Sequence, residues 1–255
     1  MILRAFSRFA KRSRLPEGVR VYAVGDLHGC ADLLSGAFDV IDADLARSRP
    51  ERPIEVFLGD YIDRGPDTRL TLDLLIERRR LRHETVFVRG NHESLLTSFL
   101  DEPRLLASWG QLGGLATLTS YGIAMSADDI ARREQDIRNA FAAALPHAHF
   151  EFLVGLVPCF SCGDFFFTHA GVRPGIPLGQ QSEHDLMWIR EPFLSSERSF
   201  GKMIVHGHTP VREPDVRNSR INIDTGAYAT GRLTVLAIED DRLEFHFSTR
   251  SHLRR

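Results

Sequence analysis

The sequence predicts an α/β fold, and three observations support that prediction. Residues 19–88 alternate short apolar runs with helical patterns. A polar loop with glycine at or near its start follows each apolar run. The 255-residue chain is 43% apolar and 26% charged, which is typical of a soluble globular protein and argues against a disordered, collagen-like or membrane-spanning chain. A chain of this length forms one large domain or two small ones.

Five elements are predicted in residues 19–88. Residues 19–24 (VRVYAV), 53–58 (PIEVFL) and 85–88 (TVFV) are short apolar runs, and each predicts a strand. Residues 31–46 carry apolar side chains at the three- and four-residue spacing of a helix that buries one face. Residues 68–80 predict a second helix. The order of elements is therefore βαβαβ.

The loops after these three strands contain polar motifs. Strands joined by such crossovers are parallel, so all three end at the same edge of the sheet. The loops are GDLHG (Gly25–Gly29), GDYIDRGP (Gly59–Pro66) and RGNHE (Arg89–Glu93). We therefore expect their side chains to converge on one rim.

Residues 101–150 contain none of these polar motifs. The glycine pair at 113–114 and the helical spacing over 128–144 predict a mainly helical, cap-like excursion that shapes a substrate groove over the rim. For Trp109 and Tyr121 in this excursion, a role in packing is as good an interpretation as a role in shaping the groove. After it, residues 165–168, 203–205 and 233–238 predict further strands.

Six side chains in these loops are candidate metal ligands. They are Asp26, His28, Asp60, Asn91, His169 and His208. A mixed set of oxygen and nitrogen ligands suits Mn, Fe or Zn and is poor for calcium. Six ligands are about what two catalytic ions need when waters fill the open positions, and a carboxylate such as Asp60 could bridge them. A lone histidine at a strand end is more often structural, so the interpretation depends on all the motifs occurring together.

Charge divides the chain into a basic arm, residues 1–18, and one domain, residues 19–250. The first 17 residues carry a net charge of +4, although the whole chain has a formal charge of −2. This balance argues against a surface built for nucleic acid. Ile2, Leu3, Phe6 and Phe9 recur at helical spacing. The arm is therefore either an amphipathic helix for an anionic membrane surface or a partner protein, or a frayed basic tail.

The cysteine pattern favours a cytoplasmic protein. Three cysteines cannot close a set of disulfides, and the start of the chain lacks the apolar core of a secretory signal. Cys159 and Cys162 form a lone CxxC, which we interpret as structural packing because a zinc site needs further ligands. Cys30 is interpreted first as a small buried residue and second as a redox-sensitive thiol near a metal.

The motifs together resemble the bacterial and phage branch of the phosphoprotein phosphatase (PPP) family, within the calcineurin-like metallophosphoesterase superfamily. The resemblance covers about residues 21–238. Its motifs stand in the family order, as GDLHG, GDYIDRGP, RGNHE, THAG at 168–171 and HGHTP at 206–210, supported by WIRE at 188–191 and IDTGA at 223–227. The resemblance implies a central β-sandwich of two mixed sheets flanked by helices, with two divalent ions at the strand ends, Mn²⁺ first and Fe or Zn as alternatives.

The resemblance also implies how the ligands are shared. The first ion is expected to be held by Asp26, His28 and Asp60. The second is expected to be held by Asp60, Asn91, His169 and His208. His206 stands where the family demands no ligand, so we expect a structural role there.

The expected reaction is hydrolysis of phosphate monoesters by a metal-dependent serine/threonine protein phosphatase. A hydroxide between two ions would attack phosphorus directly, because metal coordination lowers the pKa of water from 15.7 to about 7. An alkoxide is a poor leaving group, so a general acid is needed. We expect His92 to be that acid and Asp63 to hold its ring. No cysteine or serine nucleophile stands within the motifs.

Arginines are expected to hold the phosphate, because guanidinium groups are permanently charged, planar donors. Arg64 and Arg190 match the phosphate-binding arginines of the family, and Arg89 is a weaker third candidate. Asn91 is expected to contact the phosphate as well as the metal. The expected partner is a phosphoprotein or phosphopeptide substrate.

Two other functions stay open. The first is symmetrical dinucleoside tetraphosphate hydrolysis, whose enzymes resemble the same family but carry a motif similar to GDLVARGP, without the acid at the Asp63 position, and GNHD where this chain has Glu93. The second is a non-catalytic phosphoprotein-binding module, although all eight ligand and acid positions are present. Turnover of p-nitrophenyl phosphate with manganese separates the module from an enzyme.

Overall fold

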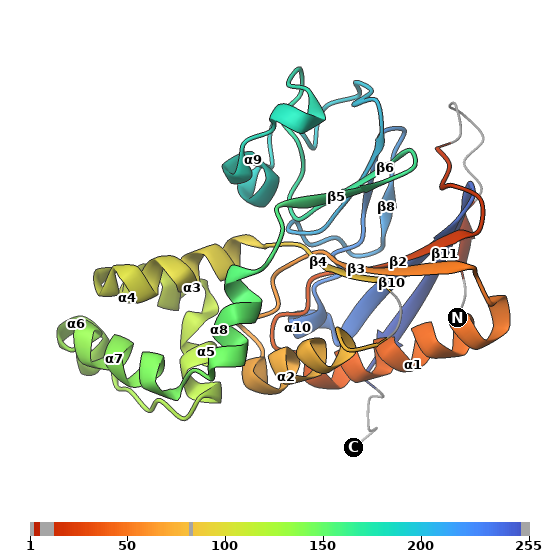
Figure 1. Ribbon diagram of the computed structural model, residues 1–255. Helices are drawn as coiled ribbons and strands as arrows, with labels where there is room; N and C mark the ends of the chain where they lie inside the picture. Colours follow the sequence, from red (N-terminus) through yellow and green to blue (C-terminus); the bar gives the residue numbers. More distant parts are fainter. Residues whose placement is uncertain (1–2, 6–12, 82–83, 251–255) are drawn as a thin grey trace.

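A computed structural model describes residues 3–5, 13–81 and 84–250. Within these ranges, two mixed β-sheets stack on each other between layers of helices (Figure 1). The α/β sandwich expected from the motifs is therefore confirmed. None of the helices in the described ranges has the length and apolar character needed to cross a bilayer.

The first sheet has six strands in the described residues. In spatial order they are β1 (Leu3–Ala5), β11 (Arg242–Thr249), β10 (Arg232–Glu239), β2 (Val19–Val24), β3 (Arg52–Phe57) and β4 (Glu84–Phe87). Strands β2, β3 and β4 are parallel, and the other neighbouring pairs are antiparallel. The three expected strands are thus adjacent and end at one edge.

The second sheet has five described strands. In spatial order they are β5 (Cys159–Cys162), β6 (Phe165–Thr168), β7 (Met203–His206), β9 (Arg220–Asn222) and β8 (Asp215–Val216). The central strands β6, β7 and β9 are parallel, so the loops after β6 and β7 leave in the same direction.

Alternation along β2 explains the layering. Val21 and Ala23 pack with the second sheet, and Tyr22 and Val24 face the helical side, because successive side chains of a strand point to opposite faces. Helices α1 (Ala31–Ser48) and α2 (Thr68–Arg78) cover that side (Figure 1). The outer face of the second sheet is covered by α9 (Glu183–Trp188) and the segment after it.

Residues 91–154 are almost entirely helical and lie together beside the ends of the parallel strands (Figure 1). The α-helices are α3 (Asn91–Asp101), α4 (Leu106–Trp109), α5 (Leu115–Ser120), α6 (Ala127–Arg132), α7 (Glu134–Ala144) and α8 (His147–Val154). Short 3-10 helices occupy Pro103–Leu105 and Leu178–Gln180, and a π-helical turn, Gly110–Gly114, joins α4 to α5. Helix α10 (Ala227–Thr230) precedes β10.

The basic arm differs from both interpretations of it where it is described. Leu3–Ala5 forms an edge strand that pairs antiparallel with Leu243–Phe245, so these three residues are neither helix nor frayed tail. Of the four apolar residues in the pattern, only Leu3 lies in this strand, and three residues are too few to separate a helix from a strand by their spacing. Positions 2, 6 and 9 of that pattern lie outside the described residues.

The cysteines lie in packed positions. Cys159 and Cys162 stand three residues apart on strand β5, so their side chains belong to opposite faces of the sheet and pack in different clusters. No group of metal-binding side chains in the described ranges includes either of them. Burial raises the pKa of Cys30 to about 11, so its thiol stays protonated at neutral pH.

Candidate metal centre

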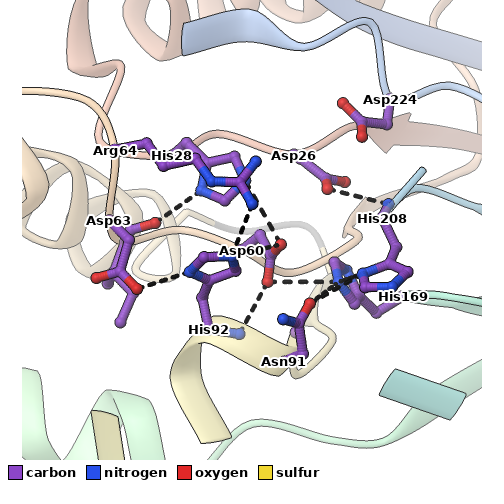
Figure 2. A network of polar contacts seen from close by, with 12 residues as sticks. Asp26, His28, Asp60, Asp63, Arg64, Asn91, His92, His169, His208 and Asp224 are labelled. Atoms are coloured by element: carbon purple, nitrogen blue, oxygen red, sulfur yellow. Dashed lines mark hydrogen bonds and ion pairs between the residues drawn. The ribbon is translucent and has the colours of Figure 1, made fainter. Parts of the chain in front are cut away.

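The candidate ligands converge where the strands of both sheets end. Asp26 and His28 follow β2, Asp60 follows β3, and Asn91 begins α3 just after β4. His169 follows β6, and His208 follows β7. All six side chains are buried, and Figure 2 shows them facing one another.

Asn91, His169 and His208 meet at Asp60. The Asn91 Oδ1 atom lies 2.9 Å from His169 Nε2 and 2.9 Å from His208 Nδ1. His169 Nε2 is also 3.4 Å from Asp60 Oδ1. Four potential ligand atoms from four segments thus surround one point, which is the composition expected for the second ion.

The hydrogen-bonding of His169 fits a cation at this point. Its Nδ1 lies 2.8 Å from the carbonyl oxygen of Leu58, which only accepts, so Nδ1 carries a proton. In a neutral ring, Nε2 then directs a lone pair at the oxygens of Asn91 and Asp60. Positive charge between these atoms is needed, either as a second proton on His169 or as a metal ion.

The electrostatics of His169 agree with this geometry. Burial lowers the pKa of His169, but the negative charge of Asp60 and its hydrogen bond raise the pKa to about 10 overall. The carboxylates therefore attract a proton to the place that a bound cation would take instead.

A second cluster contains His28, Asp60 and His92. The Asp60 Oδ2 atom is 3.5 Å from His28 Nε2 and 3.9 Å from His92 Nε2. His28 Nδ1 lies 2.9 Å from the carbonyl oxygen of Ile62, which fixes its tautomer and leaves Nε2 free to bind a metal. Asp60 belongs to both clusters, as a bridging carboxylate must.

Asp26 lies beside these clusters and is incompletely satisfied. One carboxylate oxygen accepts the backbone N–H of His208 at 3.0 Å. The other, Oδ1, is buried with no hydrogen-bond partner among the described residues, and so is Nε2 of His208. A buried carboxylate oxygen without a partner is costly, and a metal ion would satisfy it.

Burial sets the protonation of the remaining ligands. It lowers the pKa of His28 to about 3 and that of His208 to about 3, so both rings are neutral, as metal-binding imidazoles must be. Burial and the charge of Asp224 raise the pKa of Asp26 well above its usual range. The surrounding histidines outweigh burial at Asp60 and hold its pKa well below the usual range.

His92 and Asp63 form a close buried pair. His92 Nδ1 is 2.6 Å from Asp63 Oδ2, and both side chains are buried. Burial lowers the pKa of His92, but the charges of Asp60 and Asp63 outweigh it and leave the pKa raised. The ring is thereby oriented with Nε2 toward the centre of the site (Figure 2).

The arginines are placed differently from one another. Arg64 is partly buried, and its Nη2 is 3.2 Å from His92 Nε2. Arg190 is exposed, and its positive charge contributes to lowering the pKa of His208, so it lies near the rim. Arg89 donates instead to the carbonyl oxygens of Val154 and Leu156, at 3.3 and 3.4 Å, and supports the end of α8.

Backbone strain is concentrated at the site. Among the described residues other than glycine, seven have φ between +45° and +70°, and five of them are His28, Asp60, Asp63, Arg64 and His208. Each such residue costs about 1–3 kcal/mol and persists only where its surroundings hold it. Strain of this kind is typical of functional sites.

Several site residues were not predicted. Glu93 accepts the N–H groups of Gly90, Asp60 and Tyr61 at 2.9, 3.0 and 2.7 Å, and so fixes the loop that carries Asp60. Burial and the charge of Asp60 raise the pKa of Glu93 to about 7. The sequence does contain a signal for this role. Glu93 is the third residue of helix α3 and its side chain returns to the helix N-terminus, as in a capping box.

Tyr228 and Trp109 also lie at the site. The Tyr228 ring is 5.2 Å from the His28 ring and 4.9 Å from the Arg64 guanidinium carbon. Trp109 donates its Nε1–H to Asp63, at 2.8 Å. Nothing in the local sequence distinguishes these aromatic side chains from packing residues. His206 is buried against Phe193, so the structural role expected for it fits its surroundings.

Comparison with known proteins supports the same chemistry. The family model of calcineurin-like phosphoesterases matches residues 19–240. A relative from Bacillus thuringiensis, the bis(5'-nucleosyl)-tetraphosphatase PrpE [asymmetrical], is 27% identical, and the match covers 84% of this chain and 88% of that protein.

Two solved structures share the fold. A candidate diadenosine tetraphosphatase is 22% identical with a TM-score of 0.57, covering 86% of this chain and 88% of that one. A cold-active protein-tyrosine phosphatase from a Shewanella species is 15% identical with a TM-score of 0.54, covering 94% and 85%. Because the family model spans most of the chain and the site has the geometry described above, this protein belongs to the calcineurin-like phosphoesterase family and is a metallophosphoesterase.

Proposed function

We propose that this metallophosphoesterase is a serine/threonine protein phosphatase that hydrolyses phosphate monoesters with His92 as general acid. The observation that supports the proposal most strongly is the His92–Asp63 pair, at 2.6 Å. A general acid contributes about 10²–10⁴-fold to rate and is needed most when the leaving group is an alkoxide. A dyad built for proton donation therefore favours an alkyl phosphate substrate.

The ligand sets proposed for two divalent ions draw on both clusters, with Asp26 added to His28 and Asp60 and with His92 reserved as the acid. Asp26, His28 and Asp60 would hold one ion, and Asp60, Asn91, His169 and His208 the other. When bound, such ions act as Lewis acids on the phosphoryl group and lower the pKa of water to about 7. We propose Mn²⁺ first, as the family resemblance implies, with Fe or Zn as alternatives that the same mixed ligands also suit.

The chain's own residues have distinct tasks in this mechanism. Asp63 accepts the Nδ1 proton of His92 and so leaves Nε2 to deliver a proton to the leaving oxygen. Arg64 can only donate, so its contact with His92 Nε2 at 3.2 Å suits an unprotonated Nε2. A phosphate dianion would draw Arg64 to its own oxygens, which frees Nε2 to be protonated. Arg190 at the rim and Asn91 would complete the phosphate contacts.

A second function is favoured by the named relatives. PrpE of Bacillus thuringiensis is an asymmetrical bis(5'-nucleosyl)-tetraphosphatase, so hydrolysis of dinucleoside tetraphosphates is the alternative. A nucleotide leaving group needs less protonation than an alkoxide. The two functions therefore differ in how strongly they should depend on Asp63.

The test compares wild type with Asp63→Asn on three substrates, with Mn²⁺ present. These are a phosphoserine peptide, p-nitrophenyl phosphate and diadenosine tetraphosphate. We expect wild type to have its highest kcat/KM on the peptide, and Asp63→Asn to lose about 10²–10⁴-fold there while Mn²⁺ binding, followed by calorimetry, is retained. A higher kcat/KM for diadenosine tetraphosphate would contradict the protein phosphatase proposal. Phosphopeptide binding without turnover would favour a non-catalytic module.

A further inference from the structure

We call the helical region 91–154 the helical cap. One short segment of it contacts both Asp63, the partner of His92, and Arg64, the proposed phosphate ligand. It runs from Trp109, the last residue of α4, through the turn at 110–114 to Thr117 in α5, and we name it the cap segment. We propose that the cap segment positions Asp63 and Arg64 for catalysis, with Trp109 and Thr117 as positioning residues for the general acid. This inference rests on the proposed function of His92.

Each oxygen of the Asp63 carboxylate accepts one hydrogen bond from the cap segment. Trp109 Nε1–H donates to Oδ2 at 2.8 Å, on the oxygen that also contacts His92. The Thr117 hydroxyl donates to Oδ1 at 2.6 Å. These donors hold the carboxylate in place beside the His92 ring.

Thr117 also holds the backbone of Asp63. Its Oγ1 accepts the Asp63 N–H at 3.0 Å while its hydrogen goes to the carboxylate of the same residue. Asp63 has a φ angle of 70°, a backbone conformation that residues other than glycine rarely adopt without support. Thr117 is completely buried, so no water replaces these bonds readily.

The packing of Trp109 makes its position precise. Its ring is fully buried and lies 4.9 Å from the Phe99 ring, with Phe141 beyond it. A Cβ on Gly114 would lie 2.4 Å from the Trp109 ring. The indole is therefore fixed by the cap core, and its one polar atom is directed at Asp63.

Arg64 is held by the middle of the same segment. The Gly113 carbonyl oxygen accepts the Arg64 N–H at 3.1 Å, and the Leu112 carbonyl accepts Nε–H at 3.4 Å. Gly113 has φ of 113°, and a Cβ there would lie 2.6 Å from Arg64 Cγ. Only glycine fits this close approach. The acid and the phosphate contact are thus set by one piece of chain.

The first experiment separates positioning of the acid from general support of the fold. Thr117→Val keeps the shape and removes both bonds to Asp63, and Trp109→Phe keeps an aromatic ring without the donor. We expect kcat on a phosphoserine peptide to fall about 10- to 100-fold, the equivalent of one charge-assisted hydrogen bond. On p-nitrophenyl phosphate, whose leaving group needs little protonation, we expect a loss of about twofold or less.

Matched controls come from the same cap. Thr119→Val changes an exposed threonine of α5, and Tyr121→Phe removes a buried hydroxyl that contacts His149 at 2.6 Å. Neither control should change the ratio of peptide to p-nitrophenyl phosphate kcat. An equal loss on both substrates in Thr117→Val and Trp109→Phe would overturn the inference, because it would indicate damage to the whole site.

A double-mutant cycle tests whether the segment acts through Asp63. Adding Thr117→Val to Asp63→Asn should cause no further substrate-selective loss, because the group it positions is already gone. A full further loss would refute the route through Asp63. If Asp63→Asn itself shows no substrate-selective loss, the proposed acid is wrong, so the two failures are distinguishable.

The arginine part of the inference has its own test. Gly113→Ala should raise KM for the peptide and for p-nitrophenyl phosphate alike by about tenfold, with the kcat ratio unchanged, because it displaces Arg64. Gly122→Ala is the control, since Gly122 also has positive φ, of 81°, but a methyl group added there would have no atoms within 4 Å of it. Equal KM values in Gly113→Ala and wild type would overturn this part.

Discussion

Replacement of Glu93 by glutamine tests whether a buried carboxylate holds the loop that carries Asp60. Oε2 accepts the N–H groups of Gly90 and Asp60, and Oε1 accepts those of Tyr61 and Ile62. A glutamine has one acceptor oxygen, so in either orientation its NH₂ group faces at least one of these donors. The orientation that keeps the bonds to Gly90 and Asp60 sacrifices those to Tyr61 and Ile62, at 2.7 and 3.4 Å.

The expected magnitude follows from that count. A buried donor without a partner costs about 1–3 kcal/mol, and the loss of charge assistance adds to it, so Glu93→Gln should lower the free energy of unfolding by roughly 2–4 kcal/mol. For a chain of this size, 1 kcal/mol corresponds to about 2–4 °C in Tm, which gives a drop of roughly 4–16 °C. Mn²⁺ affinity should fall as well, because the loop that carries Asp60 loses its contacts at Tyr61 and Ile62.

The assay is thermal unfolding followed by circular dichroism, together with calorimetric titration of Mn²⁺. Glu77→Gln, which changes an exposed carboxylate on α2 that pairs with Arg80, is the matched control and should leave both quantities unchanged. If Glu93→Gln unfolds within about 2 °C of wild type, the argument that Glu93 holds the Asp60 loop is wrong.

Three further predictions concern the metal, the rim and the core. Mn²⁺ at about 100 times Kd should stabilise the chelator-treated protein by about 2.7 kcal/mol, which is measured as a rise in Tm. Asp60→Asn should abolish this rise, and an equal rise in the variant would exclude Asp60 as a ligand. Tyr228→Leu should raise KM for phosphate substrates several-fold in steady-state kinetics, and Tyr228→Phe, which keeps the ring beside Arg64, should not. Equal KM values in Tyr228→Leu and wild type would show that the ring has no role in substrate binding. Arg78→Leu breaks a buried pair with Glu55, at contacts of 2.9 and 3.1 Å, and should cost about 3–5 kcal/mol in denaturant unfolding. Arg52→Leu, at an exposed pair, should not change the midpoint, and similar midpoints for both variants would refute the magnitude expected for Arg78.

Local patterns were sufficient for the elements that lead into the site. The expected strand 19–24 is β2, and the expected helices 31–46 and 68–80 agree with α1 and α2 to within two residues. Their apolar spacing is a property of adjacent residues, so it is visible without tertiary contacts. The rule that parallel strands end together then places the ligand loops on one rim.

The remainder depends on contacts between distant segments. Strand β1 forms because Leu3–Ala5 meets β11, some 240 residues later, and a three-residue run carries no signal of its own. The role of Trp109 could not be predicted for the same reason, because its hydrogen bond depends on where Asp63 lies in space. The helical spacing over 128–144 is real, but Arg133 interrupts it, and Ser126 caps a separate helix, α6.

The strained residues explain why the cap and the metal centre belong to one functional unit. His28, Asp60, Asp63, Arg64 and His208 hold conformations that their own sequence does not favour. Each is supported from a distant segment, as Asp60 is by Glu93 and Asp63 is by Thr117. Each such conformation costs about 1–3 kcal/mol, and these hydrogen bonds offset that cost. In the proposed mechanism the cap segment supports the strained conformations of Asp63 and Arg64, so changes in its sequence should alter the proposed acid and phosphate contact without touching a candidate metal ligand.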